Sequence, residues 1–195
     1  RGWAVVQGDD ALHPEYLHST LHHIVYQSEE DLENSSVNYI VLRLGSVYGY
    51  GGDSMRINIM PNLFSKMAAI GNPIKLFGGG VQWKSLVSLF DVARCMKFVA
   101  EKDEIKRQVF HLRNENMTVK DVAEICKEFV PALDLTETDD EIPNQGYTLS
   151  NQKLLDTGFE FRNNIRDDIK GMIDAWSDVS LRRDVLEYKF DGGKE

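Results

Sequence analysis

The sequence predicts an α/β protein with a parallel sheet, and three observations support this. Short apolar segments rich in β-branched residues recur along the chain, as expected of buried strands. Longer segments with apolar residues at helical spacing alternate with them over most of the length, which predicts at least one parallel βαβ crossover. The length of 195 residues is enough for one sizeable domain with a hydrophobic core.

In the first half of the chain, residues 15–34 form the first expected helix, since their apolar residues fall mostly on one face. VNYIVLRL (37–44) is short, apolar and β-branched, which predicts a buried strand. The glycine-rich segment 45–54 follows as a loop at that strand's carboxyl end. A helix is expected at 57–70, where the sequence Gly-Asn-Pro directly afterwards stops it. The opening residues RGWAVVQGDD show no helix or strand pattern.

The remaining elements are predicted on the same grounds, with Asp91 and Thr118 as helix N-caps and Gly158 as a helix end. They are strands at 74–80, 85–90 and 108–113, helices at 91–101, 117–130, 152–159 and 166–179, and an acidic loop at 137–141.

Composition and charge exclude several classes of protein. The net charge of −9 disfavours a nucleic-acid partner, because phosphate backbones require a basic surface. No segment is apolar and long enough to span a bilayer and no signal-peptide pattern is present, so we expect no membrane partner. Cys95 and Cys126 are expected to be small buried apolar residues, which fits a cytoplasmic protein, and the lack of a C-x-x-C pair predicts no metal site.

Five motifs follow one another in a fixed order. They are Tyr16 in the first helix, RLGSVYG (43–49), NIMP (58–61), FGGGVQWK (77–84) and FDVA (90–93). In this order they resemble the C-terminal half of the extended short-chain dehydrogenase/reductase superfamily, the NAD-dependent sugar-nucleotide epimerases and dehydratases. The resemblance covers roughly residues 10 to 177. It implies the C-terminal part of a Rossmann-like doubly wound parallel sheet plus a small α/β substrate-binding domain.

The resemblance also implies a domain division. The end of the Rossmann-type domain is expected at 1–55, a mainly substrate-binding lobe with crossover strands at 56–180, and a tail at 181–195. The family's first half carries G-x-x-G-x-x-G, whose glycines let the backbone approach the cofactor pyrophosphate. This motif does not occur here, so we expect the N-terminal cofactor half to be absent and NAD or NADP to be bound mainly by that half.

By resemblance, the catalytic positions are Tyr16 and Thr20, which match the family's Y-x-x-x-K. The family tyrosine takes a proton from a substrate hydroxyl, and its lysine favours the phenolate, since a free tyrosine has a pKa of about 10. A threonine supplies no charge, although its hydroxyl can orient a water or a ribose. His18, His22 or His23 remains an alternative but less favoured source of positive charge.

The resemblance further assigns binding positions. Tyr16 and Val47 match positions at the nicotinamide end of the cofactor. Ser46 stands where the family has an asparagine near the substrate phosphate, and Lys84 where many members have an arginine on the diphosphate. The positions expected along the nucleotide are Asn58, Ile59 and Met60, followed by Lys75, Leu76 and Phe77.

Three functional hypotheses follow. The favoured one is part of an NAD(P)-dependent epimerase, dehydratase or reductase acting on a nucleoside-diphosphate sugar. A non-catalytic relative that serves as a ligand-binding or regulatory subunit is the alternative, because Thr20 and Ser46 depart from the family and the stretch 139–145 lacks its second arginine. A structural domain that pairs with a separate chain is the third, and it would expose an apolar sheet edge along 37–44. The resemblance also allows a homodimer through the helix 15–34.

Overall fold

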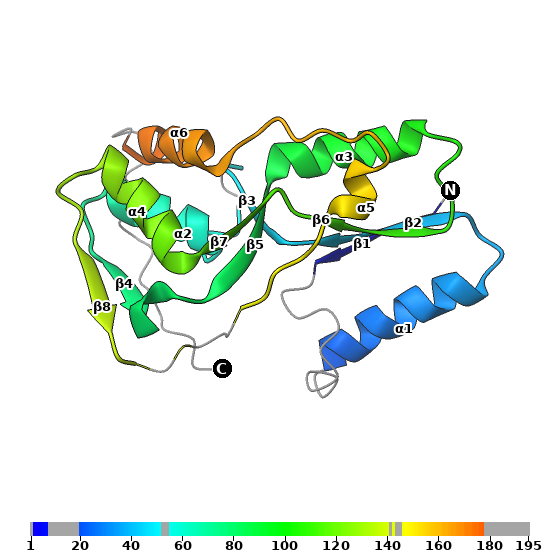
Figure 1. Cartoon of the computed structure of the whole chain (residues 1–195), viewed down its shortest axis with the longest axis horizontal. Helices are drawn as coiled ribbons and strands as arrows, with labels where there is room; N and C mark the ends of the chain where they lie inside the picture. Colours follow the sequence, from blue (N-terminus) through cyan, green and yellow to red (C-terminus); the bar gives the residue numbers. More distant parts are fainter. Residues whose placement is uncertain (1, 8–19, 52–54, 141, 143–145, 178–195) are drawn as a thin grey trace.

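The computed structural model describes residues 2–7, 20–51, 55–140, 142 and 146–177, with side chains from Tyr26 onward. Figure 1 shows a sheet with helices on both sides at one end of the molecule and a smaller α/β lobe at the other. The elements are β1 Gly2–Gln7, α1 Thr20–Asn34, β2 Tyr39–Leu44, β3 Ser46–Tyr48, α2 Met60–Ala69, β4 Ile74–Phe77, η3 Gly78–Gly80, β5 Trp83–Ser88, α3 Leu89–Glu101, β6 Gln108–Leu112, β7 Glu115–Thr118, α4 Val119–Phe129, β8 Leu135–Thr138, α5 Gln152–Leu155 and α6 Ile165–Ser177.

The first sheet is parallel and has the order β1-β2-β6. Its middle strand, β2, is bonded on both sides, so the exposed edge that the third hypothesis placed along 37–44 is wrong. Strand β1, for which the sequence showed no pattern, pairs with β2 along its whole length. A short apolar run has no periodicity of its own, and only the neighbouring strand identifies it as a strand.

Alternate residues of β2 point to opposite faces of this sheet. Ile40 and Leu42 pack in one cluster with Cys95 and other residues of α3. Tyr39 and Val41 pack on the other side with Leu32 of α1. Figure 1 shows α1 and α3 on opposite sides of the sheet. The arrangement confirms the predicted Rossmann-like, doubly wound α/β class.

The smaller lobe has its own hydrophobic core beneath α2, α4 and α6. Two short sheets line it, with the orders β3-β5-β7 and β4-β8. Helix α4 begins at Val119, with Thr118 as its N-cap, as predicted. The Thr118 side chain accepts a hydrogen bond from the backbone N–H of Asp121, and the Asp121 carboxylate accepts one from the backbone N–H of Thr118 in return.

Other elements differ from the sequence predictions. Strand β3 lies inside the predicted loop 45–54, while β7 and β8 were not predicted. These strands have three or four residues each, too few to show an alternating pattern. Asp91 does not cap α3, because that helix begins after Ser88 and the buried Asp91 carboxylate binds the backbone of residues 162 and 163 instead.

Cys95 and Cys126 are both fully buried free thiols, as predicted. Burial raises the pKa of each thiol to about 12. Among the described residues, no helix combines the length and the hydrophobicity that a membrane crossing requires.

Candidate functional site

The site begins where the chain leaves β2 and crosses into the smaller lobe through Gly45. The Gly45 backbone N–H donates to the carbonyl of Leu112 at 3.0 Å. A Cβ at Gly45 would lie 2.6 Å from the backbone oxygen of Ser85, so no larger residue fits without a shift. The crossing therefore depends on glycine, and it places β3 directly beside β5.

The pairing of β3 with β5 determines which residues share a face. Ser46 is paired with Leu86, and Lys84 precedes Leu86 by two residues on β5. Residues two apart in a strand point to the same face and are about 7 Å apart, so Ser46 and Lys84 share one face of this sheet. Ser46 is nearly buried and Lys84 is half-buried. The two residues expected near the phosphates are thus on neighbouring strands.

The glycine-rich loop after β3 is held by Asn62, in the first turn of α2. The Asn62 side-chain oxygen accepts from the Gly49 backbone N–H at 2.9 Å, and its amide nitrogen donates to the Arg56 carbonyl at 3.1 Å. Asn62 is only 3% exposed. Sequence reasoning missed this residue, although an asparagine at the start of an apolar helix was a usable signal.

The start of α2 and the two residues before it contain three of the predicted nucleotide positions. Asn58 is exposed, Met60 is half-buried and Ile59 is buried in the core. Asn58 is therefore the one whose side chain is most open to a ligand, while Ile59 offers only its backbone. Strand β4 shows the same division, with Lys75 exposed, Phe77 37% exposed and Leu76 fully buried.

The three glycines after β4 form the short helix η3 and have positive φ angles. A Cβ at Gly80 would lie 3.0 Å from the backbone nitrogen of Lys120, so this turn packs closely on the start of α4. Lys120 itself pairs with Glu137 at 2.6 Å. The glycines therefore allow a close approach between this turn and α4.

A polar network fixes the other side of β5. Ser85 Oγ donates to Asn116 Oδ1 at 2.7 Å and accepts from the Leu149 backbone N–H at 2.7 Å. Arg113 Nε donates to the Leu149 carbonyl, also at 2.7 Å. The segment that follows the acidic stretch is thereby held against β5, and Gly146 forms a bridge with Trp83 beside Lys84. Sequence reasoning did not place Asn116.

The two tyrosines of the loop pack rather than react. Tyr48 is 1% exposed and lies in the core of the smaller lobe. Burial raises its pKa well above the ordinary value, and the charges of Asp168 and Glu115 raise it further. Tyr50 makes an edge-to-face contact with Trp176, with ring centroids 5.3 Å apart. Both tyrosines therefore contribute to packing, Tyr48 at the end of β3 and Tyr50 in the loop after it.

The expected catalytic pair is Tyr16 and Thr20. Tyr16 lies outside the described residues, as does His18. Thr20 is the first residue of α1, and its side chain is not among those described. Their geometry therefore stays a prediction.

The fold and the site define a class of protein, a Rossmann-like α/β fold extended by a second lobe at the carboxyl ends of its parallel strands. The model of the NAD dependent epimerase/dehydratase family matches residues 8–112. The chain belongs to this family, which confirms the resemblance stated from the motifs.

Solved structures share the fold. UDP-glucose 4-epimerase from Thermotoga maritima, solved with UDP-glucose, matches with a TM-score of 0.73 and 19% identity, over 95% of this chain and 64% of that one. The Thermus thermophilus UDP-glucose 4-epimerase, in complex with NAD, matches with a TM-score of 0.70 and 16% identity, over 91% of this chain and 64% of that one. The dTDP-glucose 4,6-dehydratase of Bacillus anthracis, also in complex with NAD, matches with a TM-score of 0.69 and 14% identity, over 89% of this chain and 60% of that one. The chain thus spans under two thirds of each of these proteins.

Proposed function

We propose that the longest natural form of this protein is an NAD(P)-dependent enzyme that epimerises, dehydrates or reduces the sugar of a nucleoside-diphosphate sugar. The observation that carries the proposal is the crossing at Gly45, which sets Ser46 and Lys84 on one face beside the carboxyl end of β2. Ligands of open α/β sheets bind at this end of the strands. The structural relatives whose names include UDP-glucose or NAD support the same ligand classes.

Each binding residue has a role that suits its exposure. Lys84 supplies positive charge to the diphosphate, and Ser46 supplies a hydroxyl donor. The backbone of residues 58–60 binds the nucleotide, with Asn58 also offering its amide. Phe77, which is 37% exposed, packs against the nucleobase beside Lys75. Leu76 is fully buried and contributes only through the backbone of β4.

The described residues at the nicotinamide end fit the rim of a cofactor site. Val47 is half-buried, and it packs against the apolar cluster between α3 and the first sheet. NAD(P), when bound, would supply hydride transfer. Tyr16 would receive the proton from the substrate hydroxyl, and Thr20 would orient a ribose or a water in place of a lysine. No contact among the described residues favours the non-catalytic alternative.

We also propose that two copies associate through the helix 15–34. Helix α1 lies at the outside of the first sheet, where Tyr26 is 48% exposed. An exposed aromatic on an outer helix is typical of an interface residue.

We keep the domain division as a separate proposal. The end of the Rossmann-type domain is at 1–55, the mainly substrate-binding lobe with crossover strands at 56–180, and a tail at 181–195.

Ligand-dependent thermal stability tests the proposed function. A ligand that binds only the folded state raises the melting temperature by mass action. We expect one of NAD and NADP, and one class among UDP-, GDP-, CDP- and dTDP-sugars, to stabilise the longest natural form. Lys84→Gln should weaken the nucleotide response and keep the cofactor response, while Lys170→Gln, on the exposed side of α6, should keep both. No response to any of these ligands would contradict the proposal.

A further inference from the structure

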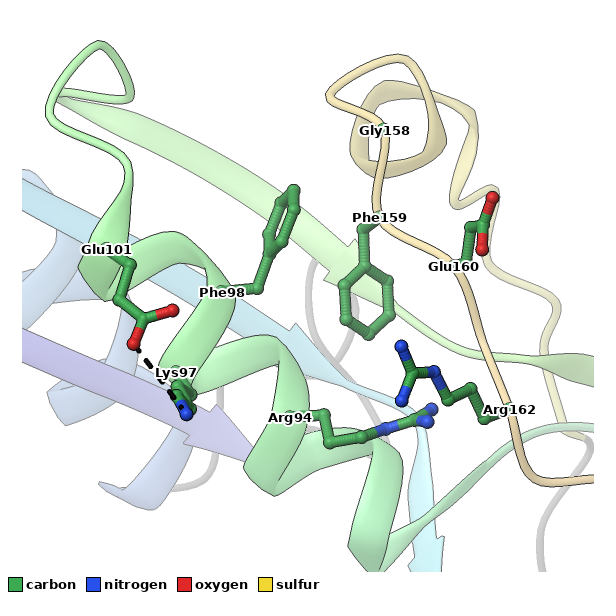
Figure 2. Close-up of a pocket in the computed structure, with 8 residues that line it drawn as sticks. All are labelled: Arg94, Lys97, Phe98, Glu101, Gly158, Phe159, Glu160 and Arg162. Carbon is green, nitrogen blue, oxygen red and sulfur yellow. Dashed lines mark ion pairs between the residues drawn. The ribbon is translucent and has the colours of Figure 1, made fainter.

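A pocket lies between helix α3 and the segment that leads to α6. It has a volume of about 400 Å³. Arg94, Lys97, Phe98 and Glu101 line it from α3, and residues 158–160 and Arg162 line it from the opposite side (Figure 2). None of its residues belongs to the site proposed above for the nucleotide sugar.

Two guanidinium groups meet in this pocket. Figure 2 shows Arg94 and Arg162 extending toward each other across the gap between their two segments. Burial lowers the pKa of Arg94, and the positive charge of Arg162 lowers it further. The two like charges are therefore close enough to repel each other. Such an arrangement is unfavourable unless an anion lies between them.

The carboxylate of Asp91 lies near these arginines, but both of its oxygens already have partners. It is fully buried and forms an ion pair with Arg94. Its two oxygens also accept from the backbone N–H groups of Arg162 and Asn163, at 3.2 and 3.1 Å. Asp91 thus balances one arginine and anchors the irregular segment before α6 that carries the other. It does not reach the Arg162 guanidinium in any described contact.

Donors remain available after these contacts. Arg94 Nε is buried and makes no hydrogen bond to any described residue. The Arg162 guanidinium has no hydrogen-bond or ion-pair partner within the described part of the chain. The remaining acidic side chains of the pocket are directed elsewhere, since Glu101 pairs with Lys97 at 3.8 Å and Glu160 points away from the guanidiniums in Figure 2.

We propose that Arg94 and Arg162 form an anion site that binds the phosphate group of a small phosphorylated molecule. Planar guanidiniums match phosphate oxygens with paired hydrogen bonds, and the charge of Arg162, which Asp91 does not reach, leaves one net positive charge to attract an anion. The pocket is larger than a phosphate needs and has the size of small-molecule sites. Phe98 and Phe159, in edge-to-face contact at 5.4 Å, supply an apolar wall for the rest of the ligand.

Side-chain NMR of the longest natural form tests the site, with inorganic phosphate and glucose 1-phosphate as probes. We expect the Nε–Hε signals of Arg94 and Arg162 to shift saturably with both probes. The dissociation constant should be lower for glucose 1-phosphate than for inorganic phosphate. Chloride at the same ionic strength should leave them unchanged. Signals that do not move, or that move equally with chloride, would overturn the proposal.

Two variants separate this site from the rest of the protein. Arg162→Gln changes an exposed side chain and should weaken phosphate binding at least about tenfold, as expected for the loss of a charged hydrogen bond. Arg166→Gln, also exposed, is the matched control and should bind phosphate normally. Lys84→Gln should likewise retain the Arg94 response, because the proposed nucleotide site is not involved. Unchanged phosphate affinity in Arg162→Gln would refute the site, whatever the outcome for the proposed enzyme activity.

Discussion

The side-chain oxygen of Asn62 accepts a hydrogen bond from the backbone N–H of Gly49 at 2.9 Å, which fastens the loop after β3 to the first turn of α2. Through its other end the same amide binds the carbonyl of Arg56 at 3.1 Å. One buried side chain thus holds both parts of the loop that adjoins the candidate site.

Asn62→Leu should therefore destabilise the protein. It leaves the Gly49 N–H and the Arg56 carbonyl without their partner, at a cost of about 1–3 kcal/mol for each group that stays buried. Urea denaturation measures the free energy of unfolding. Asn72→Ala, at an exposed asparagine just beyond the same helix, should change it by less than about 0.5 kcal/mol. Equal losses of unfolding free energy in the two variants would show that the Asn62 hydrogen bonds do not stabilise the loop.

A pair of glycine substitutions tests the crossing between the lobes. Gly45→Ala places a Cβ 2.6 Å from the Ser85 backbone oxygen and should lower the melting temperature. Gly171→Ala, inside α6 and with no atom near the added methyl, should instead stabilise by roughly 0.5–1 kcal/mol. Calorimetry of both variants checks the opposite signs. A tolerated Gly45→Ala would mean that the strands can separate at no cost.

The ion pair between Arg43 of β2 and Glu29 of α1 should contribute to stability. Arg43 Nε lies 3.1 and 3.2 Å from the two Glu29 oxygens, and both side chains are largely buried. Glu29→Gln should cost about 1.5–3 kcal/mol, because it leaves a partly buried guanidinium without its counter-charge. Asp174→Asn, which breaks an exposed pair with Lys170, should cost under about 0.5 kcal/mol. Chemical denaturation in low salt compares the two, and similar values would contradict this interpretation.

The buried thiols should make the protein sensitive to alkaline pH. Burial raises the pKa of Cys95 and of Cys126 to about 12 in the folded protein, against an ordinary value of 9.0. A raised pKa stabilises below pH 9, and that contribution is lost as the pH rises from 9 toward 12. Between pH 8 and 10.5 each thiol should remove roughly 2 kcal/mol under reducing conditions. The double variant Cys95→Ala/Cys126→Ala should lose correspondingly less, and an identical pH dependence would exclude the thiols as its cause.

Most of the fold could be predicted from the sequence where local signals were strong. Helix α4 combines an apolar face with a Thr118 cap, and β2 is a clear apolar run. Asp91 shows the limit, because an acid at a helix start has the pattern of a cap while its true partners lie 71 and 72 residues away. The same holds for the short strands, which are defined by their neighbours.

The candidate site was predictable only through motif order. Periodicity alone gives no reason to bring Ser46 near Lys84, since the crossing at Gly45 and the β3–β5 pairing are long-range. The Arg94 and Arg162 pair had no sequence signal for the same reason. Segments far apart in the sequence come together in the fold, and neither segment has a local sequence pattern that predicts the contact.

The central claim is tested most directly by turnover of the longest natural form with NAD or NADP and the nucleotide sugar that stabilises it. NMR of the sugar product measures the rate, and thermal shift measures ligand affinity in parallel. We expect turnover in the native protein, its loss in Tyr16→Phe with ligand affinity kept, and a higher rate in Thr20→Lys. Turnover that is unchanged in Tyr16→Phe, or absent in the native protein while both ligands bind, would contradict the proposed catalytic role.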